Sequence, residues 1–189
     1  MIHKVCDDCA LGMFNTKCKC LNGVGNPMSG MIIVVPNVDY DAYKNKGMNF
    51  SKYVEIINEV ITPFTGGLEQ LVPFIVPLIR CKLDAKCPVN QYIANRCMLH
   101  TFADIRINNI KKIMLLGSAA TNFSFDITKG KDKLYYVSPF VYSTNYSPFV
   151  KFIDDNKYKE FCNRLIKWIS ANKDNNYNGM EIINILNDT

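Results

Sequence analysis

Short apolar runs alternate with helical patterns along most of this chain, and this alternation constrains its fold more than any other feature. The run Met31 to Val35 is apolar and rich in β-branched residues, as in a strand buried on both faces of a parallel sheet. Strands alternating with helices join through right-handed crossovers, which predicts a three-layer α/β/α fold around a central, mostly parallel four-stranded sheet. Further strands are expected at 71–79, 112–116 and 134–137, and helices at 50–61, 91–107, 157–171 and 180–186.

The length of 189 residues suits one hydrophobic core, so we expect a single domain over 1–189. Residues 1–30 are rich in Cys, Gly and Asn, which predicts an irregular lobe held by something other than periodic packing. Residues 157–189 are expected to form the carboxy-terminal helices.

Composition restricts partners and location only loosely. The net charge of +5 and pI of about 8.7 suit contact with an acidic polymer without requiring it. No apolar run is long enough to span a bilayer and the first residues lack the apolar core of a secretion signal, so we expect no membrane partner and a location in the cytoplasm or in a particle assembled there. The abundance of Asn, Lys, Ile and Tyr is typical of AT-rich genomes such as those of many phages.

Eight cysteines in a cytoplasmic chain favour metal or cluster ligation over disulfides, because cytosolic thiols are kept reduced. Cys6-Asp7-Asp8-Cys9 places two thiolates on one turn, a geometry that suits zinc and iron-sulfur clusters alike. Two more ligands are needed, and spacing alone does not choose them. Cys18 and Cys20 would complete a local zinc knuckle; the other candidates are Cys81, Cys87, Cys97 and Cys162.

Taken in order, five landmarks resemble the iron-sulfur uracil-DNA glycosylases of family four, over most of the chain. They are the Cys6-to-Cys9 motif, the Gly-rich segment 23–27 before the first strand, Arg80-Cys81 at the end of a strand, Cys97 at the start of a helix, and Leu116-Gly117-Ser118-Ala119-Ala120 after a later strand. The resemblance implies the glycosylase fold and a [4Fe-4S] cluster that braces the loops facing DNA, with zinc as the alternative metal. Its ligands would be Cys6, Cys9, Cys81 and Cys97.

The groups that perform base excision in that family are replaced here. Aligned on the prolines and cysteines, Val34 stands at the position of the acid and Pro77 at that of the uracil-reading Asn, while Ser138-Pro139 replaces the His-Pro pair. Losing a positioned acid or base costs about 10²–10⁴ in rate and losing an anion-stabilising donor about 10²–10³, so the resemblance implies a domain without efficient excision. Asp39 and Asp41 are weak substitutes; their carboxylates equally suit caps on backbone amides.

Several other side chains are candidates for contact with DNA or a protein partner. Phe50 stands where the family has an aromatic residue that stacks on the base, although it also begins an apolar helical face. His100 is interpreted as a packed or surface residue instead of a relocated catalyst. The remaining candidates come from a basic loop and from an aromatic-rich region: Lys129, Lys131, Lys133, Phe140 and Tyr142.

These observations favour a non-catalytic, glycosylase-like protein of phage origin. It would be a structural or assembly component of a virus particle, with protein partners or copies of itself as neighbours, or a DNA-binding accessory factor. The alternative is a divergent iron-sulfur glycosylase that acts on uracil or a modified pyrimidine with Asp39 or Asp41 as its acid.

Overall fold

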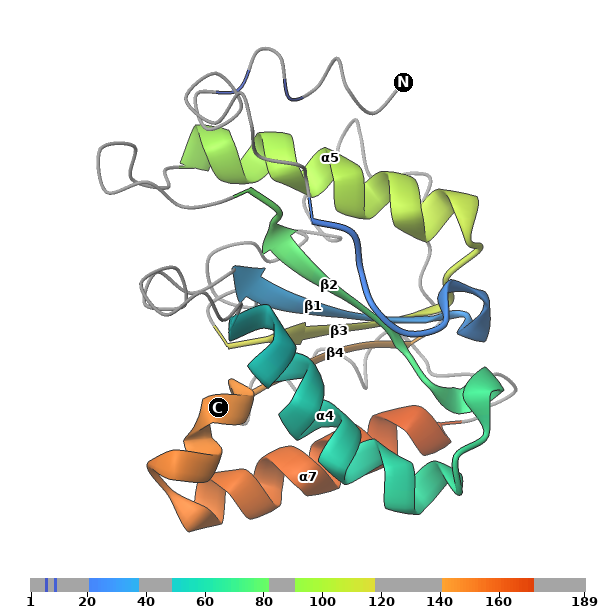
Figure 1. Cartoon of the computed structure of the whole chain (residues 1–189), viewed down its shortest axis with the longest axis vertical. Helices are drawn as coiled ribbons and strands as arrows, with labels where there is room; N and C mark the ends of the chain where they lie inside the picture. Colours follow the sequence, from blue (N-terminus) through green and yellow to red (C-terminus); the bar gives the residue numbers. More distant parts are fainter. Residues whose placement is uncertain are drawn as a thin grey trace.

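A single four-stranded parallel sheet forms the centre of the molecule (Figure 1). The computed structural model describes Cys6, Cys9 and residues 21–37, 49–81, 91–117 and 141–171. Within these residues the strand order is β2-β1-β3-β4, and each neighbouring pair is parallel. The strands are β1 (Met31–Asn37), β2 (Phe74–Ile79), β3 (Lys112–Leu116) and β4 (Val141–Asn145).

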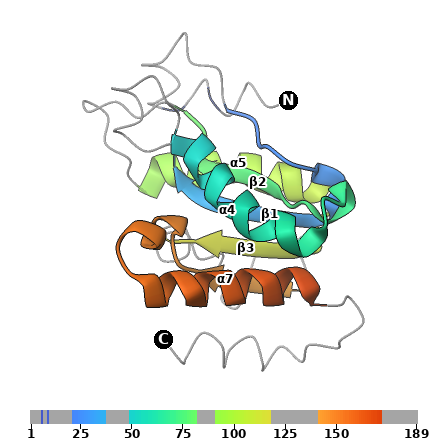
Figure 2. The same ribbon diagram turned by 60° about the horizontal axis from the view of Figure 1, so that its bottom comes forward.

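Helices cover both faces of this sheet, which confirms the three-layer α/β/α fold (Figures 1 and 2). Alternate residues of β1 point to opposite faces. Ile32 and Val34 pack in a core cluster that includes Ile105 of α5 (Gln91–Ile107), whereas Ile33 and Val35 pack with residues of α4 (Asn49–Thr65) and α7 (Asp155–Ser170). Since α4 connects β1 to β2 and α5 connects β2 back across β1 to β3, right-handed crossovers place these two helices on opposite faces.

The helix ends follow local chemistry closely. The structure confirms the predicted limits of α5, and α4 continues two residues past Pro63 before it ends. Gly66 and Gly67 then adopt φ values of 59° and 78°, the left-handed conformation that commonly terminates a helix. Short 3₁₀ helices lie at η1 (Pro27–Ser29), η2 (Glu69–Leu71) and η3 (Pro148–Phe152). None of the helices in the described ranges is long and apolar enough to cross a membrane.

The fourth strand of the described sheet differs from the prediction. It is Val141–Asn145, which pairs with β3 from Lys112↔Val141 to Leu116↔Asn145, whereas the predicted segment 134–137 lies outside the described residues. β4 has no continuous apolar run: it lies at the edge of the described sheet and contains Ser143, Thr144 and Asn145. Ser138-Pro139 therefore precedes β4 in the sequence. Tyr146-Ser147-Pro148 follows the carboxyl end of β4.

The Gly-rich segment after residue 20 runs antiparallel to β2. The amide of Val24 donates to the carbonyl of Ile75 at 2.9 Å, the amide of Ile75 donates back at 2.7 Å, and the amide of Leu21 donates to the carbonyl of Arg80 at 2.9 Å. Gly25 allows this approach: its φ is 100°, and a Cβ there would lie 2.2 Å from the Pro73 carbonyl oxygen. The paired segment thus begins beside the carboxyl end of β2 and runs toward its amino end.

Candidate metal centre

Three cysteines from distant parts of the sequence lie in one buried cluster. Cys9, Cys81 and Cys97 are 4%, 6% and 5% exposed. Cys81 follows the end of β2, and Cys97 lies in the first half of α5. The apolar residues of the same cluster are Ile79, Ile93 and Ala94.

Cys6 completes the set at its more exposed side. It is half-buried, and its carbonyl accepts a hydrogen bond of 3.1 Å from the amide of Cys9, so the two cysteines share one tight turn. Its Sγ lies 3.2 Å from Nε2 of His100. Among the described cysteines, which also include Cys162, there is no disulfide.

His100, interpreted from the sequence as a packed or surface residue, also belongs to this site. It is 5% exposed and lies one turn after Cys97, on the same side of α5. Burial lowers the pKa of His100, the nearby positive charge of Arg80 lowers it further, and Asp104 opposes both. The signal in the sequence was the Cys97-x-x-His100 spacing, which places two possible ligands on one helix face.

A buried ion pair lies beside the cysteines. Arg80, 5% exposed and adjacent to Cys81, pairs with Asp104 of α5. The backbone carbonyl of Arg80 accepts a hydrogen bond from the amide of Leu21. The side-chain Nε–H of Arg80 has no hydrogen-bond partner among the described residues. A buried guanidinium with a spare donor suits an anionic neighbour.

The donor set fits a thiolate-ligated iron-sulfur cluster in its chemistry. Three thiols gather with apolar side chains, Cys6 shares a turn with one of them, and Arg80 precedes Cys81 in the sequence. A [4Fe-4S] core with four thiolates carries about two negative charges, which a nearby cation would offset. Within the described part of the chain, however, no three His, Cys, Asp or Glu side chains already converge as in a preformed metal site. Backbone packing brings the segments together, and the Sγ of Cys6 lies within hydrogen-bond distance of His100.

Cys162 does not belong to this site. It lies on α7 and packs against the core cluster that α4 and α7 form on the other face of the sheet from α5. Burial raises the pKa of the Cys162 thiol, as expected for an ordinary core thiol. The other cysteines considered for ligation, Cys18, Cys20 and Cys87, lie outside the described residues.

The positions aligned with two excision groups lie inside the sheet. Val34 is fully buried in β1 and pairs with Val76 and Leu115, and Pro77 lies within β2 opposite Val35. Neither supplies a polar group.

Phe50, a candidate contact residue, lies in the core. Its side chain is 3% exposed and packs in the core between the sheet and α4, because it begins the apolar face of that helix. Tyr142 lies in β4, where its backbone pairs with Ile113 of β3. The other predicted positions lie outside the described residues: Asp39, Asp41, Lys129, Lys131, Lys133 and Phe140.

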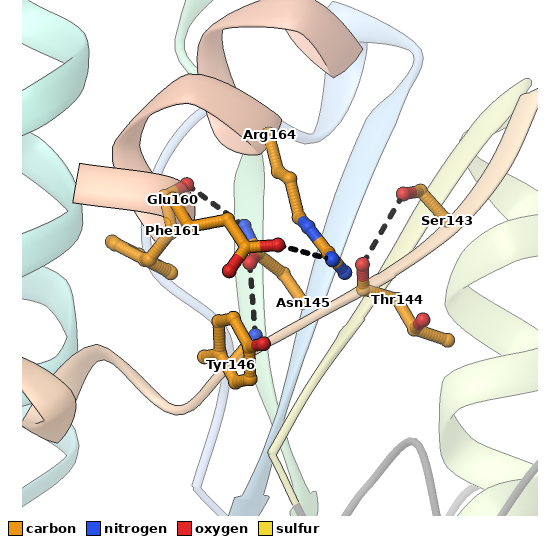
Figure 3. Close-up of polar contacts among 7 residues, drawn as sticks. All are labelled: Ser143, Thr144, Asn145, Tyr146, Glu160, Phe161 and Arg164. Atoms are coloured by element: carbon orange, nitrogen blue, oxygen red, sulfur yellow. Dashed lines mark hydrogen bonds and ion pairs between the residues drawn. The ribbon is translucent and has the colours of Figure 1, made fainter. Parts of the chain in front are cut away.

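Polar side chains at the carboxyl end of β4 connect this strand to α7 (Figure 3). The side chain of Asn145 is buried, and its Nδ2 donates to the backbone carbonyl of Phe161 at 2.9 Å. Its Oδ1 accepts from the backbone amide of Tyr146 at 2.8 Å. The guanidinium of Arg164 lies 5.3 Å from the ring of Tyr146 and pairs with Glu160. This end of β4 is thus occupied by structural contacts.

Comparison with known proteins adds no family to this geometry. No protein-family model matches the chain, and a search of curated proteins finds no match.

Proposed function

We propose that this chain is a non-catalytic, glycosylase-like domain of phage origin that carries a [4Fe-4S] cluster and works as an assembly component of a virus particle. The observation that carries the proposal is the gathering of Cys9, Cys81 and Cys97 in one buried cluster, with Cys6 one turn away. These are the four ligands that the resemblance to the iron-sulfur glycosylases implies.

The cluster would have a structural role. Cys6 and Cys9 would join the amino-terminal segment to the end of β2 through Cys81 and to α5 through Cys97. Thiolates from three segments held by one inorganic core supply folding free energy in the way of other structural metal sites.

The absence of base excision is supported by the groups described at the aligned positions. Val34 and Pro77 are core residues of strands. At the end of β4, the side-chain amide of Asn145 donates to the carbonyl of Phe161 in α7 and accepts from the backbone amide of Tyr146. These residues offer no acid, base or base-reading amide to a substrate.

An exposed apolar pair favours a protein partner over DNA. Phe152 and Ile153, at the turn between η3 and α7, are 61% and 83% exposed. The Nζ of Lys52 lies 5.9 Å from the Phe152 ring. Adjacent aromatic and aliphatic side chains with a cation at the rim are typical of an interface centre. We therefore place the assembly contact at Phe152 and Ile153.

The test combines oligomeric state with an excision assay on the purified full chain. We expect a defined oligomer by light scattering and no abasic product from single- or double-stranded DNA that contains uracil. The double variant Phe152→Ser, Ile153→Ser should associate about 30-fold more weakly, the effect of losing a hot spot of about 2 kcal/mol.

Phe64→Ser with Ile107→Ser is the matched control, since both side chains are exposed apolar residues elsewhere on the surface. Abasic product whose formation Asp41→Ala abolishes would establish the divergent glycosylase instead. A monomer that binds DNA in a salt-dependent manner would establish the accessory factor.

A further inference from the structure

We propose that His100 is a positioning residue of the metal centre, whose Nε2–H donates a hydrogen bond to the Cys6 thiolate and so retains the cluster. This inference rests on the proposed metal centre. It adds the His100 imidazole, which would bind a ligand sulfur and not the metal. That sulfur belongs to Cys6, the one proposed ligand that is only half-buried.

Cys6 is the ligand that most needs such support. The other three thiols are at most 6% exposed, so their surroundings exclude water. A thiolate at the exposed corner of a cluster is the first to be reached by oxygen, protons or a chelator. An N–H donor to its sulfur fixes the ligand and delocalises its charge, and groups of this kind strongly affect metal affinity and reduction potential.

The fold holds His100 rigidly at this position. It lies on the same helix as the ligand Cys97, one turn away, and its 3.2 Å contact joins α5 to the turn that carries Cys6 and Cys9. Two charged side chains act on the ring, Arg80 from the end of β2 and Asp104 one turn further along α5. In its charged form or in its Nε2–H tautomer the imidazole supplies an N–H donor at Nε2, the atom that lies 3.2 Å from the Cys6 sulfur.

The experiment compares variants that keep or remove the donor, in protein purified without oxygen. We expect His100→Leu to lose iron to a chelator about 10-fold faster than the unchanged protein, the lower end for loss of an outer hydrogen bond, and to show a lower cluster reduction potential. His100→Gln retains an N–H donor and should restore most of both properties. His100→Met is a second apolar variant in case the leucine variant folds poorly.

Thr101→Val is the matched control, because Thr101 is the next buried residue of α5 and its hydroxyl has no hydrogen-bond partner in the described structure. It should leave iron release and potential unchanged. If the unchanged protein holds iron and the apolar variants release it at the same rate and potential, the role of His100 is overturned while the metal centre stands. If the unchanged protein binds no iron, the metal centre and the role of His100 are overturned together.

Discussion

Lys112 of β3 is a buried cation whose side chain reaches the carboxyl end of helix α7. Only 8% exposed at the start of β3, it extends its Nζ to the carbonyl oxygens of Ile169 at 2.8 Å and Trp168 at 3.4 Å. Both carbonyls belong to the last turn of α7, where intrahelical donors run out and the helix dipole is negative. One charged side chain therefore holds the end of α7 against the sheet.

Replacing this lysine should be costly. We expect Lys112→Met to lower the free energy of unfolding by about 2–3 kcal/mol, because it removes hydrogen bonds from a charged donor and leaves buried carbonyls unsatisfied. Lys167→Met removes an exposed lysine from the last turn of α7 and should change the free energy of unfolding by no more than about 0.5 kcal/mol. Urea denaturation measures both, and equal effects would show that the buried hydrogen bonds are not the cause.

Helix α7 shows how an element is defined by both local and distant contacts. Its apolar face buries Phe161, Leu165, Trp168 and Ile169, and β4 holds its middle through Asn145. Its first turn is capped locally: the Asp154 carboxylate accepts hydrogen bonds from the amides of Asn156 at 3.0 Å and Lys157 at 3.1 Å. The amide of Lys157 is the main cause of the lowered pKa of Asp154.

This cap predicts an acid-dependent loss of stability. A carboxyl group whose pKa is lower in the folded state than its ordinary 3.8 stabilises the fold above that value, and the contribution is lost as the pH falls through the folded pKa. Asp154→Asn keeps an accepting oxygen but does not titrate. We therefore expect its free energy of unfolding, measured by urea denaturation over a pH series, to fall less than that of the unchanged protein below pH 3.8. Parallel pH curves would contradict the role of the charge.

At the scale of the whole molecule, the sheet topology gathers the cysteines. The segment that starts at Leu21 runs antiparallel to β2 and meets Arg80, beside Cys81, while α5 returns across the sheet and contributes Cys97. α7 covers the other face, so Cys162 lies away from them. The fold thus sorts its described cysteines into four possible ligands and one core thiol.

That sorting gives a direct test by metal removal. We expect Cys81→Ser to lose most of its iron and to melt at least about 5 °C lower, which corresponds to roughly 2 kcal/mol in a chain of this length. Cys162→Ser should keep its iron. Iron and sulfide analysis and thermal melting followed by circular dichroism measure the two effects. Retained iron in the Cys81 variant, or lost iron in the Cys162 variant, would contradict the assigned ligands.

Prediction from sequence succeeded where a segment had a clear local identity. The limits of β3 and α5 match the predicted ranges, since β3 contains a continuous apolar run and α5 is a stretch without glycine or proline. β4 was missed because an edge strand is partly exposed and does not need an apolar run. His100 was interpreted only as a packed or surface residue, because nothing near it in the sequence indicates that Cys6 would be its neighbour.

The sequence by itself determined the layered α/β architecture, since alternating apolar periods and helix-ending glycines act over a few residues. The tertiary structure alone decided that Cys9, Cys81 and Cys97 lie in one cluster, that Cys6 faces His100, and that Cys162 belongs to the core on the other side. It also decided that Phe50 lies in the core and that the side chain of Lys112 binds a carbonyl in the last turn of α7. These outcomes depend on which distant segments pack together, and the side chains that meet there carry no local signal of their partners.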